Sequence, residues 1–135
     1  MKKIVVIDGQ GGRIGAMVIA KLKAVRSEQE VFAIGTNSIA TAAMVKAGAN
    51  YGATGENPVV VSSRNADIIV GPLGIIAADS LVGEVTPAMA VAVGQSAAQK
   101  VLLPVNKCNH FVVGMQDRPF QEIIELAVKH IATLL

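Results

Sequence analysis

Short apolar runs alternate with helical patterns along the chain. Three of these runs, at 3–7, 31–34 and 66–70, have the length of a strand, and the third is the most apolar. Between the first two runs, apolar side chains recur at helical spacing: Ile14, Met17, Val18, Leu22 and Val25. This alternation predicts a parallel sheet with helices on both of its faces.

The rest of the chain continues the alternation. A helix is expected after Thr36, with Asn37 or Ser38 as its N-cap and Gly48 as its stop. The remaining predicted elements are a short strand at 50–53, a helix from Asn57, a helix at 86–98, strands at 100–105 and 110–113, and an amphipathic helix at 120–131. The connection 106–109 is too short for a parallel crossover, so the last two strands should form an antiparallel hairpin or splay apart.

The order of these elements predicts one α/β domain. We expect residues 1–135 to form a single Rossmann-like, nucleotide-binding domain in three layers. Its mostly parallel sheet should have the strand order 3-2-1-4-5, with an added C-terminal edge strand.

A glycine-rich loop, "DGQGGRIG" at 8–15, follows the first strand. Its glycines are Gly9, Gly11, Gly12 and Gly15, so the dinucleotide pattern G-x-G-x-x-G is not met, and no G-K-[ST] of a P-loop follows. The stretch is partly similar to the T-G-x-x-x-G-x-G loop of short-chain dehydrogenases. Glycine lets the backbone close on a phosphate, and a helix start offers unpaired N–H groups. The loop therefore predicts a nucleotide site, and a tight turn without a ligand is the alternative.

Two charged residues adjoin the loop. Asp8 ends the first strand, where it either caps loop N–H groups or holds a ribose hydroxyl, a substrate or a hydrated Mg²⁺. Arg13 lies beside the helix start and either neutralises a phosphate or is solvated.

The second strand bears on which nucleotide would bind. NAD sites place an acidic residue roughly 20 residues beyond the loop to bind the ribose, and "IGTNS" at 34–38 contains none. Thr36, Asn37 and Ser38 could instead bind a 2′-phosphate, which together with Arg13 favours NADP. The same three residues could equally serve only to cap the helix, and NAD or a mononucleotide stays open.

Other residues should gather at the carboxyl ends of the strands. Gly71, Gly74 and Asn106 are expected beside the loop, where glycine would allow a ligand to approach the backbone. Cys108, flanked by Lys107 and near His110, is a candidate nucleophile, and the alternative is a small buried residue in a turn. The only tyrosine has no lysine four residues later, which weakens the dehydrogenase interpretation, and no metal-ligand spacing is present.

Composition narrows the class of protein. The net charge of +2 is small and scattered, which argues against a nucleic-acid partner, and no apolar stretch reaches the ~20 residues of a membrane span. The single cysteine fits a reducing cytoplasm. Charged residues make up only 16% of the chain, and the helix at 86–98 is apolar nearly all round. We therefore expect a homodimer through that helix.

Several long strings give the chain a family resemblance. "VIDGQGGRIG", "AIGTNSIATAAMVKAGANYGATGEN", "ADIIVGPLGIIAADSLVGEVTPAMA" and "LLPVNKCN" cover much of it. With these strings the chain resembles a family of short bacterial proteins of unknown function with a predicted Rossmann-like fold. The resemblance implies the fold and no activity. A nucleotide-binding module thus ranks first among the functions, followed by a small NAD(P)- or Cys-dependent enzyme and then by a structural subunit of an oligomer.

Overall fold

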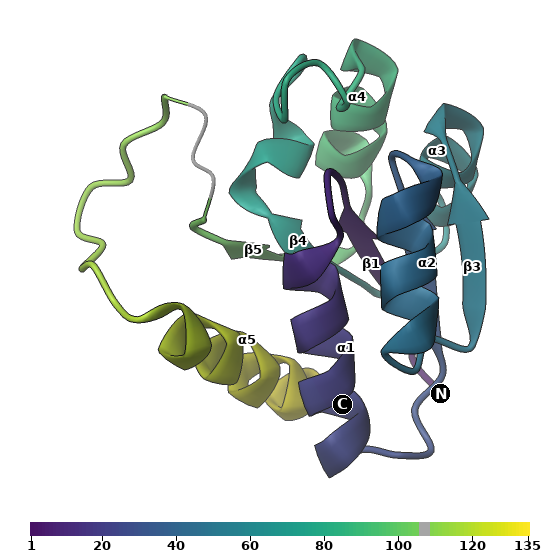
Figure 1. Ribbon diagram of the computed structural model, residues 1–135, viewed down its shortest axis with the longest axis vertical. Helices are drawn as coiled ribbons and strands as arrows, with labels where there is room; N and C mark the ends of the chain where they lie inside the picture. The colour runs from purple at the N-terminus through teal and green to yellow at the C-terminus, as the bar shows by residue number, and fades with distance from the viewer. Residues whose placement is uncertain (106–108) are drawn as a thin grey trace.

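The computed structural model describes residues 1–105 and 109–135 (Figure 1). The strands are β1 (Ile4–Asp8), β2 (Val31–Gly35), β3 (Tyr51–Thr54), β4 (Ile68–Pro72) and β5 (Gln99–Leu103). The helices are α1 (Arg13–Val25), α2 (Ser38–Lys46), α3 (Glu56–Ser63), α4 (Pro87–Gln95) and α5 (Phe120–Leu134), with a short 3₁₀ helix, η1 (Leu73–Ile76), after β4. These predicted elements are confirmed with ends shifted by a few residues, and only η1 was not expected.

The five strands form one parallel sheet in the order β3-β2-β1-β4-β5, as predicted. Central β1 is paired on both sides, with Val6 aligned with Ala33 of β2 and with Val70 of β4. Connections run toward one edge through β2 and β3 and toward the other through β4 and β5. The strand order therefore reverses beside β1, and in such sheets ligands bind beyond the carboxyl ends of the strands at this switch point.

Helices cover both faces of the sheet and give the domain its three layers (Figure 1). One aliphatic core joins α1, α2 and α5 to the sheet face that includes Ile4 and Val6. The second core joins α3, α4 and η1 to the opposite face, which includes Val5 and Ile7. Successive side chains of β1 enter opposite cores because neighbouring residues of a strand point to opposite faces. The buried sheet thus holds β1 and the loop that follows it in place.

The predicted edge strand at 110–113 is wrong. The described sheet ends at β5, and residues 109–119 run outside the body of the domain before α5 begins (Figure 1). Phe111 and Val113 are 85% and 86% exposed. A strand needs a partner for its backbone N–H and C=O groups as well as an apolar pattern. Here the chain uses these residues to reach the start of α5 on the α1 side of the sheet.

Candidate functional site

The glycine loop connects the end of β1 to the start of α1 through a tight turn. The N–H of Gly12 donates to the C=O of Gly9 at 2.9 Å, and Gly12 caps the helix with a φ of 71°. A hollow of about 200 Å³ opens over this turn; it is lined by Asp8, residues 9–14, Leu81 and Phe120. The loop predicted from the sequence therefore borders an open space at the switch point of the sheet.

The glycines of the loop differ in what surrounds them. A Cβ at Gly12 would lie 2.7 Å from the Ala40 backbone, and one at Gly15 would lie 2.5 Å from the Met44 sulfur. These two glycines let α1 pack closely against α2. A Cβ at Gly9 would lie 2.6 Å from the Thr36 hydroxyl oxygen. At Gly11 it would meet nothing within 4 Å among the described residues, so Gly11 alone of the four faces open space.

The backbone N–H groups of the loop are divided between internal partners and the hollow. Those of Gly9 and Gly15 donate to the Asp8 carboxylate at 2.8 and 2.7 Å, and that of Gln10 donates to Glu84 at 2.8 Å. In the described ranges the N–H groups of Gly11 and Arg13 have no acceptor, and both residues line the hollow. An anion at the helix start would find these two donors and the positive end of the helix dipole.

Asp8 has the capping role that the sequence allowed. Its side chain is only 3% exposed, and its two oxygens accept the N–H groups of Gly9 and Gly15. Burial removes the carboxylate from water and raises the pKa of Asp8, and the nearby Glu84 carboxylate adds to the effect, although the hydrogen bonds oppose it. Asp8 thus holds the loop in shape from beneath.

Arg13 lies at the rim of the hollow. Its guanidinium carbon is 4.8 Å from the centre of the Phe120 ring, at the first residue of α5. This stacking is a cation–π contact that orients an otherwise exposed side chain. Arg13 and Phe120 both line the hollow, so a positive charge lies at the edge of the space that the helix start borders.

The residues after β2 are engaged by a carboxylate that sequence reasoning missed. The Thr36 hydroxyl and the Asn37 side-chain amide each donate to Oε1 of Glu84 at 2.7 Å. Asn37 is also the N-cap of α2, accepting the Ala40 N–H at 2.9 Å, while Ser38 begins the helix and is exposed. The one available signal was that Glu84 is the acidic residue of "SLVGEV", in a loop after β4, whose carboxyl end faces the same crevice.

The pKa of Glu84 reflects this environment. Partial removal from water opposes its ionisation, but the hydrogen bonds from Gln10, Thr36 and Asn37 outweigh that effect and lower the pKa of the carboxyl. Glu84 is therefore an ionised acceptor at neutral pH, fixed between the glycine loop and the end of β2.

The other residues predicted to lie beside the loop are Gly71, Gly74 and residues 106–108. A Cβ at Gly71 would collide with the Ile7 carbonyl oxygen, so glycine there serves the packing of β4 beside β1. The Gly74 carbonyl accepts the Ala77 N–H at 3.0 Å and the Ser80 hydroxyl. Asn106, Lys107 and Cys108 lie outside the described residues, so chemistry by Cys108 stays a prediction.

Comparison with known proteins places the chain in a family. A family model described as a domain of unknown function, DUF3842, matches residues 3–135. The chain belongs to this family. No curated protein matches the sequence. Among solved structures, the chain is similar to a dodecameric FMN-dependent UbiX-like decarboxylase from Escherichia coli O157:H7, with 12% identity and a TM-score of 0.46 over 97% of this chain and 92% of that chain. A similarity this distant says nothing about the function of the DUF3842 chain.

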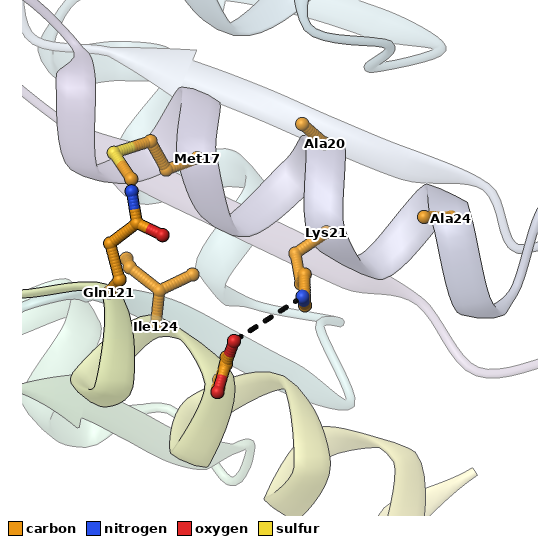
Figure 2. A pocket seen from close by; sticks show the side chains of 7 residues that line it. Met17, Ala20, Lys21, Ala24, Gln121 and Ile124 are labelled. Atoms are coloured by element: carbon orange, nitrogen blue, oxygen red, sulfur yellow. Dashed lines mark ion pairs between the residues drawn. The ribbon is translucent and has the colours of Figure 1, made fainter.

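A second hollow, of about 310 Å³, lies between α1 and α5 (Figure 2). Met17, Ala20 and Ala24 line it from α1, and Ile124 lines it from α5. The Lys21–Glu125 ion pair across it spans 3.6 Å, and both partners are largely exposed. Aliphatic side chains and a solvated ion pair are typical of the contact between two packed helices. This hollow therefore has fewer polar groups to bind a polar ligand than the glycine loop has.

In residues 1–105 and 109–135, no group of three or more His, Cys, Asp and Glu side chains could hold a metal ion. No helix in the same ranges is both long and apolar enough to cross a membrane.

Proposed function

We propose that this DUF3842 chain binds a nucleotide or dinucleotide at the glycine loop 9–15. One observation carries the proposal: the N–H groups of Gly11 and Arg13, which have no acceptor in residues 1–105 and 109–135, border an open hollow at the switch point of a parallel sheet. A phosphate placed there accepts both N–H groups and lies beside the Arg13 guanidinium. The helix dipole and the arginine then act together on one negative group.

The size of the hollow indicates which part of the ligand it holds. Its volume of about 200 Å³ is smaller than the ~300–1,000 Å³ of pockets that enclose a drug-sized ligand. We place the phosphate end of the ligand in the hollow and the nucleoside outside it, beyond the carboxyl ends of the strands. Gly11, with no neighbour near its missing Cβ among the described residues, leaves the approach open.

A thermal-shift panel of NAD, NADP, ATP, GTP and FAD tests the proposal. A ligand present at 100 times its Kd stabilises the fold by about 2.7 kcal/mol, which is a measurable shift. Gly11→Val should remove the shift, because the new side chain occupies the approach to the N–H groups. Ala24→Val is the matched control, because Ala24 is exposed in the last turn of α1, at the opposite end of the helix from the loop. Binding that survives Gly11→Val would show that the loop is not the site.

We further propose that the chain forms a homodimer through α4. Met89 and Val93 of α4 are buried in the core, whereas Val91 is 53% exposed on the outward side. A groove of about 610 Å³ runs beside it between α3 and α4, with Val60, Ala88 and Ala92 among its lining residues. A second copy related by a two-fold axis would cover this apolar face. We also propose that the protein is cytoplasmic, because its single cysteine favours a reducing compartment.

A further inference from the structure

The loop between η1 and α4 carries Glu84 to the switch point. Backbone hydrogen bonds close this loop, from the Asp79 N–H to the Val85 C=O at 2.7 Å and from the Val85 N–H to the Ser80 C=O at 3.2 Å. Leu81 is buried against Gly9, where a Cβ on the glycine would lie 2.9 Å from a Leu81 methyl carbon. Glu84 is therefore held above the glycine loop by a closed and anchored segment.

Glu84 lies where dinucleotide sites need an acid. Its Oε1 accepts hydrogen bonds from the Gln10 N–H at 2.8 Å, the Thr36 hydroxyl at 2.7 Å and the Asn37 amide at 2.7 Å. Gln10 follows β1, and the other two residues follow β2. In dinucleotide-binding folds, an acidic side chain beyond the end of β2 accepts the ribose hydroxyls. The chain lacks an acid in that strand, and the structure places one there from the loop after β4.

The second oxygen of this carboxylate is available. In the part of the chain that the structure describes, Oε2 of Glu84 has no hydrogen-bond donor, and the side chain is partly exposed. The three donors on Oε1 fix the carboxylate without using Oε2. A ribose hydroxyl is a donor that such an oxygen accepts, whereas a phosphate at the same place would meet a like charge.

We propose that Glu84 binds the ribose 2′,3′-diol of a nucleotide that carries no 2′-phosphate. This inference rests on the proposed function, because it takes the phosphate to lie at Gly11 and Arg13. It reverses the preference for NADP, since Thr36 and Asn37, two of the side chains expected to bind a 2′-phosphate, already donate to a carboxylate. The ligand class is then a ribonucleotide such as ADP or NAD, and 2′-phosphorylated and 2′-deoxy forms are discriminated against.

Titration calorimetry with ADP, 2′-deoxy-ADP and 2′-phospho-ADP tests this proposal. The wild-type chain should bind ADP about tenfold more tightly than either analogue, the ratio that one charge-assisted hydrogen bond supplies. Glu84→Gln should bring the three affinities within about threefold of each other, because the neutral amide neither favours the hydroxyl as strongly nor repels the phosphate. Glu28→Gln, an exposed acid in the α1–β2 loop, is the matched control and should keep the wild-type ratios.

The other outcomes separate the two proposals. Equal wild-type affinities for the three compounds would overturn the role of Glu84 while leaving the phosphate site in place. Tighter binding of all three by Glu84→Gln would also overturn it, because Glu84 would then be an internal anion that competes with phosphate for the Gln10 N–H. No binding of any of the three, together with no shift in the wider nucleotide panel, would refute the proposed function itself.

Discussion

Replacing Gly12 with alanine should destabilise the fold strongly, whereas the same change at Gly11 should not. Gly12 has a φ of 71°, and holding an alanine in this left-handed region costs about 1–2 kcal/mol. Its new Cβ would also lie 2.7 Å from the Cα and the carbonyl oxygen of Ala40, backbone atoms that cannot rotate away. Forcing α2 aside adds about 1–3 kcal/mol of overpacking. The free energy of unfolding should therefore fall by about 2–5 kcal/mol.

This loss is large enough to measure in two ways. For a chain of 135 residues the unfolding entropy is roughly 0.28 kcal/mol/K, so the melting temperature should fall by about 7–18 °C. Urea unfolding followed by circular dichroism should show a lower midpoint with an unchanged slope. Gly11→Ala adds a Cβ that meets nothing within 4 Å among the described residues and should change stability by less than about 0.5 kcal/mol.

Two results would refute this reasoning. Gly12→Ala could lose less than about 1 kcal/mol, or Gly11→Ala could lose as much as Gly12→Ala. Either result would mean that the loop glycines are not divided between packing and open space. This difference also decides which variant can test ligand binding. A bulky residue at Gly12 disturbs the α1–α2 contact even without a nucleotide, whereas one at Gly11 does not.

Three further changes test other parts of the structure. The pKa of Glu84 lies below its ordinary value of 4.5, so ionised Glu84 stabilises the fold at neutral pH and this contribution is lost as the pH falls through the folded-state pKa. The stability advantage over Glu84→Gln should therefore shrink between about pH 6 and pH 3 in urea titrations, and a constant difference would contradict the pKa shift. Arg13→Ala should weaken ADP binding about tenfold and reduce its salt dependence in calorimetry, with unfolding changed by less than about 1 kcal/mol; an unchanged Kd would remove Arg13 from the site. Val91→Glu should convert a dimer into a species near 13.9 kDa in light scattering, and a wild-type chain already at that mass would refute the homodimer.

The periodic part of this fold could be read from the sequence alone. Strand and helix patterns depend on which side chains recur at a spacing of two or 3.6 residues, and this information is local. The strand order followed from the doubly wound pattern of alternating strands and helices, in which the glycine loop after the first strand lies at the central switch point. The glycine loop and the Asn37 cap were found for the same reason, since each is a short motif next to a predicted element.

What the sequence could not supply depended on residues distant along the chain. The apolar run at 110–113 looked like a strand, but a strand also requires a partner edge, and the pattern carries no information about the partner. Gly11 and Gly12 are neighbours of the same type, and only the position of Ala40 in the folded chain separates an open glycine from a packed one. Glu84 accepts hydrogen bonds from Gln10 and Thr36, which are 74 and 48 residues away in sequence, because β1, β2 and β4 have their carboxyl ends on the same side of the sheet. The sequence by itself thus determined the elements and the loop, while tertiary structure decided which side chains meet there, because the path of the loops between the elements sets those contacts.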